Sequence, residues 1–253
     1  MTGRPAGLAD LHCHLLPGVD DGPATMEESL HYARRAVDAG TGVIVATPHV
    51  EHVDVRELPD AVAELRGELE RAGIPLHVEC GGELKPASVP QLSDAELDVL
   101  AHGPPGHRWL LLELPFRGLS DAFHAAADEL RGRGYTPLLA HPERTAGFGS
   151  GPMLRALRGE LERGAAIQMN VGPLRGLESE ARASAARELL RLGLAHAIAT
   201  DAHPPDRPYT LALAREAILA AGAAPAEATR LVERGPRQLL ERGLPRATQP
   251  AAR

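Results

Sequence analysis

Short apolar runs alternate with longer amphipathic stretches along this chain. Seven of the runs have the length and the flanking turn residues of buried strands: Leu8–Cys13, Val43–Thr47, Leu76–Cys80, Trp109–Leu114, Thr136–Ala140, Ala165–Asn170 and Ala195–Thr200. Between them lie stretches with the apolar period of an α-helix: Glu27–Ala39, Val55–Ala72, Ser120–Arg131, Met153–Arg163 and Glu178–Leu192. The alternation predicts repeated βα units and therefore a parallel sheet.

The repeat favours a closed barrel over an open sheet. The predicted strands recur every roughly 30 residues, the length of one βα unit, and the chain has no glycine-rich phosphate loop. Seven strands predict a distorted version of the eightfold barrel. Two or three closing helices follow from about Arg207: Tyr209–Ala221, Pro225–Glu233 and Pro236–Glu241. We therefore expect a single α/β domain over residues 1–253, a distorted (βα)7 TIM-like barrel with an ordered core over 8–243 and a loose tail over 244–253.

Composition and charge argue against several classes of protein. The net charge is −7, and Lys85 is the single lysine among 27 basic residues, so no basic patch for nucleic acid is expected. Two cysteines, Cys13 and Cys80, are too few for a disulfide framework and are typical of a reduced cytoplasmic chain. No apolar run approaches the roughly 20 residues that span a bilayer. We expect a cytoplasmic protein without membrane insertion.

Metal-ligating residue types occur at the carboxyl ends of the predicted strands, where barrel enzymes place their chemistry. In chain order these ends carry His12 and His14, His49, Glu83, Glu113, His141, Gln168 and Asn170, and Asp201 and His203, with Asp20 and Asp21 after the first strand. Because side chains alternate along a strand, His12 and His14 project to one face and Cys13 to the other. Ordinary polar loop residues are the alternative interpretation, but they would not recur at every strand end.

The donor set predicts a cluster of metal ions. Nitrogen and oxygen donors without thiolate favour manganese, iron or zinc, and the donors are too many for one ion. Two or three ions that share a bridging carboxylate typically bind a phosphoryl oxygen and activate water. Arg144 and Arg207 follow His141 and His203 closely, and their guanidinium groups suit bidentate contact with phosphate.

Two other hydrolase classes fit less well. A cysteine-dependent phosphatase needs an arginine six positions after its cysteine, where this chain has Val19 and Pro86. Metal hydrolases of the amidohydrolase type commonly use a carboxylated lysine at the fourth strand, where this chain has Glu113. The first class is excluded and the second is disfavoured.

The motifs also resemble those of a known family. DLHCHLLPGVDDG, TPH, GGE, LLELP, AHPER and TDAH resemble, in order and spacing, the bacterial PHP-type (polymerase and histidinol phosphatase) metal-dependent protein-tyrosine phosphatases. The resemblance runs from about Leu8 to the final helices. It implies the PHP fold, a distorted (βα)7 barrel, with three ions, usually manganese. It also implies hydrolysis of phosphotyrosine in proteins by in-line attack of a metal-bridging hydroxide, in partnership with a capsule or exopolysaccharide tyrosine kinase.

The resemblance also implies a role for each motif residue. His12, His14, Glu83 and Asp201 would hold the first ion; Glu83, Glu113 and His141 the second; and Asp21, His49 and His203 the third. Asp21 is preferred to Asp20 because the family uses the second aspartate of DDG. Arg144 and Arg207 match arginines that bind the phosphate. Two alternatives stay open for assisting the leaving tyrosinate, metal coordination and a protonated His203.

Two alternatives to this function stay open. One is a PHP phosphatase for small phosphomonoesters such as histidinol phosphate, and the other is an inactive scaffold that binds a kinase. The scaffold predicts a missing ligand, yet every motif position is filled. Two segments depart from the family pattern, residues 50–60 and His102–Arg108, and both are expected on loops at the mouth of the site. The physiological metal, the partner kinase, the general acid and the oligomeric state are not determined by the sequence.

Overall fold

Eight strands, all paired in parallel, form two sheets in the computed structural model, which describes residues 4–245. They are β1 (Leu8–Cys13), β2 (Thr41–Ala46), β3 (His77–Cys80), β4 (Glu83–Leu84), β5 (Trp109–Glu113), β6 (Thr136–Ala140), β7 (Ala166–Asn170) and β8 (Ala197–Ala199). One sheet has the order β1-β2-β3, and the other runs from β4 to β8 in chain order.

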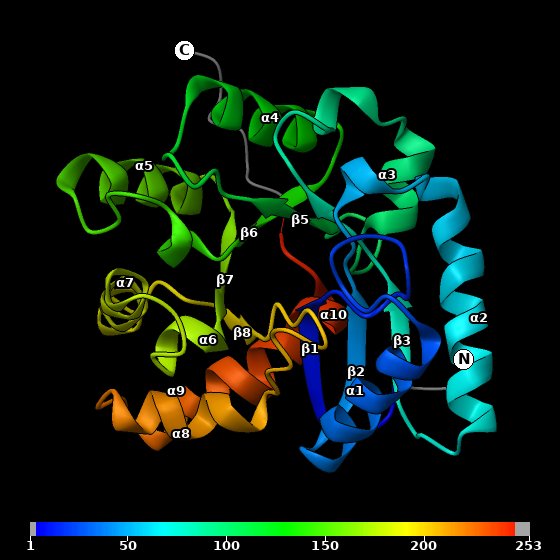
Figure 1. Cartoon of the computed structure of the whole chain (residues 1–253). Helices are drawn as coiled ribbons and strands as arrows, with labels where there is room; N and C mark the ends of the chain where they lie inside the picture. The colour runs from blue at the N-terminus through cyan, green and yellow to red at the C-terminus, as the bar shows by residue number, and fades with distance from the viewer. Residues whose placement is uncertain (1–3, 246–253) are drawn as a thin grey trace.

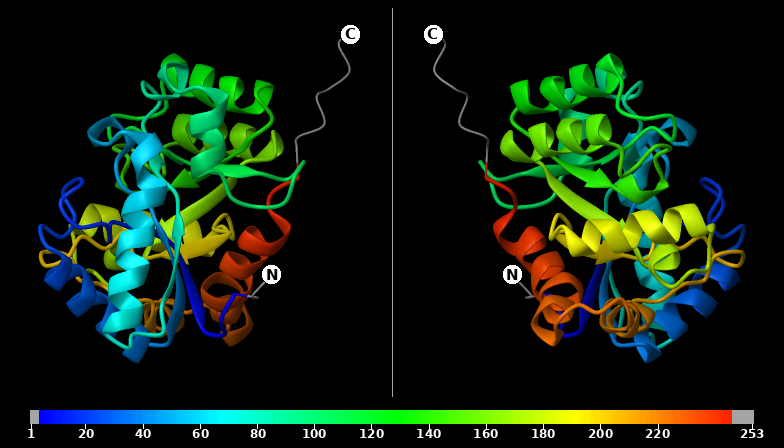
Figure 2. Two further views of the ribbon diagram at one scale, coloured as in Figure 1. Left: turned by 90° about the vertical axis from the view of Figure 1, so that its right-hand side faces the viewer. Right: turned by 90° about the vertical axis from the view of Figure 1, so that its left-hand side faces the viewer.

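Helices surround the strands (Figures 1 and 2). They are α1 (Met26–Asp38), α2 (Leu58–Arg71), α3 (Asp94–Leu100), α4 (Asp121–Gly132), α5 (Gly151–Glu162), α6 (Val171–Leu174), α7 (Glu180–Arg191), α8 (Ala212–Ala220), α9 (Pro225–Thr229) and α10 (Gly235–Arg242). The first helix begins after Thr25, whose side chain accepts a hydrogen bond from the backbone N–H of Glu28. Such a cap satisfies one of the free donors at a helix amino terminus.

Backbone and side-chain hydrogen bonds join the two sheets at the carboxyl ends of the strands. Isolated parallel bridges pair Cys13 with Ala202 and His49 with Glu83. Asp10 strengthens the first junction, because its carboxylate accepts from the Thr200 N–H at 3.0 Å and from the Thr200 hydroxyl at 2.6 Å. The ends of β1, β2, β4 and β8 are therefore held next to one another.

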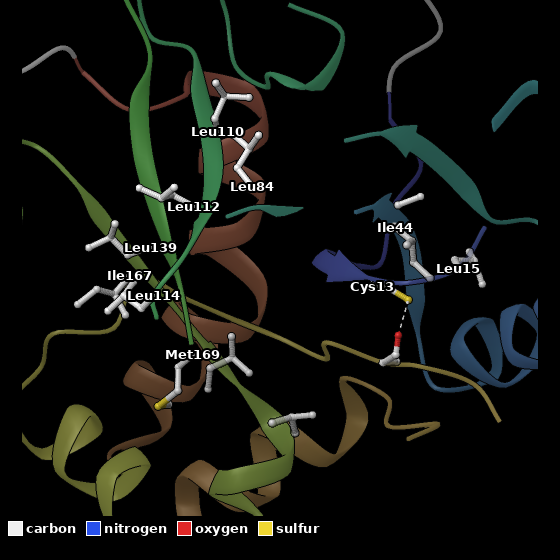
Figure 3. Packing of buried hydrophobic residues seen from close by; sticks show 14 of the residues in the cluster. Cys13, Leu15, Ile44, Leu84, Leu110, Leu112, Leu114, Leu139, Ile167 and Met169 are labelled. Atoms are coloured by element: carbon white, nitrogen blue, oxygen red, sulfur yellow. Dashed lines mark hydrogen bonds between the residues drawn. The ribbon is translucent and has the colours of Figure 1, made fainter. Parts of the chain in front are cut away.

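The apolar residues divide into an inner and an outer layer. Alternate residues of β1, β2, β5 and β6 form a cluster between the strands, and Leu239 and Leu240 of α10 complete it. The other face of the strands packs against the helices; Leu112, Leu139 and Ile167 belong to this outer cluster (Figure 3). Cys13 lies in the outer cluster, opposite His12 and His14, as the alternation predicts.

The predicted α/β fold with parallel strands is confirmed, and several boundaries differ. Seven strands were predicted and eight are present in the described chain, because the short strand β4 follows the predicted third strand, Leu76–Cys80, as a separate element. Gly81 and Gly82 connect the two, at a point where Val45 and Leu100 leave no room for a side chain. The helix α3 was not predicted. The first three residues of the predicted helix Val55–Ala72 form a 3-10 turn, and α2 follows it. The predicted helix Pro225–Glu233 is divided into α9 and a π-helical turn, Arg230–Arg234.

One predicted loop position is wrong. His102–Arg108 precedes β5 and therefore lies at the amino ends of the strands, away from the predicted site. A loop reaches the carboxyl ends only if it follows a strand, as residues 50–60 do after β2. The predicted loose tail begins too early, since Leu244 is buried in the inner cluster and its N–H donates to the His107 carbonyl at 2.9 Å; residues 246–253 of that tail lie outside the described part of the chain. Within residues 4–245, the helices are too short or too polar to cross a bilayer.

Trp109 belongs to the inner apolar layer, and its replacement tests how much this packing contributes to stability. Its side chain is 1% exposed, and its indole N–H donates to the Leu239 carbonyl at 2.8 Å, which fastens α10 to β5. We expect Trp109→Ala to lower the free energy of unfolding in urea by about 3–5 kcal/mol, since it leaves a cavity. Leu177→Ala, at a 49% exposed position, is the control and should change it by no more than about 0.5 kcal/mol. Equal losses in the two variants would contradict this packing.

Candidate metal centre

The structure brings all nine predicted ligands together at the carboxyl ends of the strands. Their donor atoms form overlapping groups, within each of which the atoms lie within 4.8 Å of one another: His12, His14 and Glu83; His12, His141 and Asp201; Glu83, Glu113 and His141; and His14, Asp21, His49 and His203. Glu83 belongs to two of these groups. The arrangement is that of a site for more than one ion with a shared carboxylate.

His12 and His14 converge on the same two carboxylates. Their Nε2 atoms lie 3.3 Å apart, and each lies 3.4–3.5 Å from Glu83 Oε2 and Asp201 Oδ1. Both side chains are fully buried. A register irregularity in β1 between Asp10 and Cys13 interrupts the regular pairing with β2 at this point. Such irregularities are common beside active sites, where they re-aim side chains.

A second set of hydrogen bonds orients the imidazole rings. His12 Nδ1 contacts Gln168 Oε1 at 3.0 Å, His14 Nδ1 contacts Asp20 Oδ2 at 2.6 Å, and His203 Nδ1 contacts the Asp201 carbonyl at 2.9 Å. Because each of these partners is an acceptor, the proton belongs on Nδ1 and the lone pair on Nε2. Metal-binding histidines are oriented in this way.

The two aspartates of the DDG motif have different positions. Asp20 is buried, accepts from His14 and from the backbone N–H of His49 at 3.0 Å, and its pKa is lowered to about 2 by these contacts despite its burial. Asp21 is 63% exposed, and its Oδ1 lies 3.2 Å from His203 Nε2 and 3.5 Å from His49 Nε2. Asp21 therefore faces two other candidate ligands, His49 and His203, whereas Asp20 bonds to Nδ1 of His14 and to the backbone of His49.

Burial and close contacts within the cluster shift the pKa values of several candidate ligands. Burial and the neighbouring carboxylate of Glu83 raise the pKa of Glu113 to about 7. Burial opposes protonation of His14, but its hydrogen bonds with Asp20 and Glu83 outweigh this and raise its pKa to about 10. His203 has the opposite shift: burial and the nearby positive charges lower its pKa to about 4, so its imidazole is neutral at pH 7. A neutral imidazole is a ligand and a poor proton donor.

Two candidate ligands have unusual backbone conformations. Among the non-glycine residues of the described chain, positive φ angles occur at His141, with φ 36°, and at Asp201, with φ 48°. The left-handed region is unfavourable for residues with a Cβ atom and is found mostly where function requires it. Here it turns each side chain toward the cluster directly after β6 and β8.

Asp201 links the cluster to one of the predicted arginines. Its Oδ2 accepts from Arg144 Nη1 and from Asn170 Nδ2, both at 2.7 Å, which leaves Oδ1 facing the histidines. Arg144 Nε is buried and has no partner among the described residues. Arg207 exchanges two backbone hydrogen bonds with His203, at 2.8 and 3.1 Å, and its side chain is half-buried. Both arginines therefore lie beside the cluster.

The donor set fits divalent ions. His141 Nδ1 and His203 Nε2 are buried without a hydrogen-bond partner in the described chain, and His12, His14 and His203 are held through Nδ1 with Nε2 on the side of the cluster carboxylates. Manganese, iron and zinc all accept such mixed nitrogen and oxygen ligands. Beside this set, Arg144 Nε is buried and has no hydrogen-bond partner in the described chain.

Sequence reasoning did not assign roles to two amide residues. Gln168 Nε2 donates to Asn170 Oδ1 at 2.7 Å, so these two side chains connect His12 to Asp201 across β7. Their spacing of two residues, which places both on one face of a strand, is the signal that could have identified them.

Comparisons with known proteins agree with this geometry. The family model for capsular polysaccharide synthesis proteins, CpsB/CapC, matches residues 8–240. Tyrosine-protein phosphatase YwqE of Bacillus subtilis is 32% identical over 200 residues, which cover 78% of this chain and 77% of that protein.

Solved structures give the same result. A structure from a study of YwqE from Bacillus subtilis and CpsB from Streptococcus pneumoniae, described as metal-dependent tyrosine phosphatases, matches with a TM-score of 0.78 and 29% identity, covering 97% of this chain and 100% of that one. The phosphotriesterase homology protein from Escherichia coli, with phosphate in its active site, matches with a TM-score of 0.62 over 92% of this chain and 98% of that one. At 13% identity this second likeness concerns the fold alone.

The comparisons confirm the resemblance that the motifs indicate. Because the family model spans nearly the whole described chain, the protein belongs to the CpsB/CapC family of capsular polysaccharide synthesis proteins.

Proposed function

We propose that this protein is a metal-dependent phosphatase that hydrolyses phosphotyrosine in proteins. The observation that carries the proposal is the position of Glu83, whose carboxylate is buried between two groups of donor atoms that lie beside an arginine. The names of the relatives support the substrate: YwqE and CpsB are called tyrosine phosphatases.

The roles that we propose follow from the contacts. His12, His14, Glu83 and Asp201 hold one ion; Glu83, Glu113 and His141 a second; and Asp21, His49 and His203 a third. Such ions, when bound, supply an activated water and neutralise charge on the phosphoryl oxygens.

The side chains around the ions orient the substrate. Arg144 is fixed by Asp201 and offers its free Nε–H to a phosphoryl oxygen. Arg207 is placed to approach the same group from the His203 side. Gln168, Asn170 and Asp20 hold the ligands in the required orientation.

Three finer assignments belong to the same proposal. We infer manganese as the metal, which the family resemblance supports, with iron and zinc compatible with the same imidazole and carboxylate donors. We infer the cytoplasm as the site of action, which the two free cysteines support. We infer a tyrosine kinase of capsule or exopolysaccharide synthesis as the partner, which the description of the family supports.

Substrate preference and two variants test the function. With manganese added, we expect hydrolysis of a phosphotyrosyl peptide to exceed that of a phosphoseryl peptide and of histidinol phosphate. Arg144→Ala should lower kcat/KM by about 10²–10³-fold, the usual cost of removing one donor to the transition state, and Glu83→Ala should abolish activity. Faster turnover of histidinol phosphate would move the protein to the small-substrate alternative. Bound metal without turnover of any substrate would favour the inactive scaffold.

Asp20 and Asp21 provide a matched pair of variants. Because Asp20 orients His14, we expect Asp20→Asn to weaken manganese binding by about 10–100-fold, with activity restored at high manganese concentration. Asp21→Asn removes a proposed ligand and should lower kcat even at saturating manganese. The measurement is a manganese titration of phosphotyrosyl peptide hydrolysis for each variant. Restoration of Asp21→Asn but not of Asp20→Asn would show that the two roles are reversed.

Metal binding should release protons. His14, with its pKa raised to about 10, and Glu113, with its pKa raised to about 7, carry protons near neutral pH that a bound ion must displace. Affinity should therefore rise between pH 6 and pH 8, because fewer protons remain to be displaced. Calorimetry of manganese binding in buffers of different ionisation enthalpy measures the number released. Binding without proton release, at an affinity independent of pH, would contradict this electrostatic picture.

A further inference from the structure

An apolar groove begins at the metal centre and follows α4. Its volume is about 650 Å³, and prolines and alanines make up most of its lining. One wall is the segment after β4, with Pro86 and Pro90, and the other is Pro115, Phe116 and the first turns of α4. Clefts of this size and lining are typical binding sites, and prolines make the walls rigid.

The inner end of the groove is continuous with the proposed active site. Glu113, a candidate ligand of the second ion, lines the groove. Phe116 also lines it, and the centroid of its ring lies 5.0 Å from the guanidinium carbon of Arg144. A phosphoryl group held by the ions and Arg144 therefore has the opening of the groove beside it.

Phe116 is unusual in its exposure. Its side chain is 47% exposed, although only 3% of the residues in the chain are aromatic. Two guanidinium groups fix the ring, Arg144 on the site side and Arg182 with its carbon 6.0 Å from the ring centroid. Its backbone carbonyl accepts from the Ala146 N–H at 2.7 Å. The groove thus has a positioned aromatic side chain at its rim, where an apolar partner could cover it.

We propose that this groove binds an apolar side chain of the substrate protein that lies next to the phosphotyrosine. The inference rests on the proposed function and adds sequence selectivity to it. A single phenyl ring would leave much of the groove unfilled, whereas a peptide segment with a leucine or a similar residue fits both its length and its lining. The exposed alanines of α4, Ala122 and Ala125, lie on the wall that such a side chain covers.

A pair of peptides tests the groove. Each peptide carries one phosphotyrosine, and the residues next to it are leucines in one peptide and serines in the other. Free phosphotyrosine is the third substrate, because it has no neighbouring residues. We expect kcat/KM for the leucine peptide to exceed that for the serine peptide by about tenfold or more, as burial of one leucine side chain allows. The difference should lie mainly in KM.

Filling the groove should remove this preference. Ala125→Trp, or Ala122→Trp if the first variant is unstable, should reduce the ratio of kcat/KM between the two peptides to near one. Ala220→Trp, at an exposed position of α8 outside the groove, is the matched control and should keep the wild-type ratio.

The outcomes separate this inference from the proposed function. Equal rates for the two peptides in the wild type, or an unchanged ratio in both groove variants, would overturn the inference while hydrolysis of free phosphotyrosine still supports the function. Absence of hydrolysis of all three substrates in the presence of manganese would overturn the proposed function and the inference with it.

Discussion

Glu83 is buried where the two sheets meet, and its carboxylate faces four imidazole rings. Oε1 lies 2.8 Å from His141 Nε2, and Oε2 lies 3.1 Å from His49 Nδ1 and 3.4–3.5 Å from His12 and His14 Nε2. Burial opposes the charge, yet these rings hold the pKa of Glu83 well below its usual range. A buried carboxylate needs such partners. Four imidazole rings supply these partners to Glu83. Each ring comes from the end of a strand next to β4 or close to it, so the need to stabilise the Glu83 carboxylate constrains where the strand ends lie.

The fold satisfies this requirement at a cost in local backbone energy. Left-handed conformations at His141 and Asp201 cost on the order of 1–3 kcal/mol each. The junction of β1 and β8, with Asp10 bonded to Thr200, holds the ends of these strands in register. The inner apolar layer then fixes the strands below the site. Rigid strands and a second set of hydrogen bonds keep the donors in place, which is what metal binding and phosphate orientation both require.

Periodicity placed the candidate ligands near one another because strand ends are defined by local sequence. His12 and His14 lie two residues apart at the end of one strand, so their common direction required no tertiary information. Asp201 and His203 lie beyond the end of β8, and the left-handed conformation that directs the Asp201 side chain could not be predicted from their spacing. The choice of Asp21 over Asp20 as the metal ligand was taken from the family resemblance, because the two residues are adjacent in one loop and only their tertiary contacts distinguish them. The groove beside Phe116 could not be predicted, because its walls come from separate loops. The misplacement of His102–Arg108 has a different origin, because the correctly predicted strand Trp109–Leu114 directly follows this segment and already puts it at the amino ends of the strands.

The claim that ions share the Glu83 carboxylate is tested most directly by anomalous diffraction from crystals grown with manganese. The account predicts anomalous peaks on both sides of the Glu83 carboxylate, one beside the Nε2 atoms of His12 and His14 and the other beside Glu113 and His141, with a third near Asp21 and His203. A single ion that does not touch Glu83, or no ion at these donors in the presence of excess manganese, would contradict it.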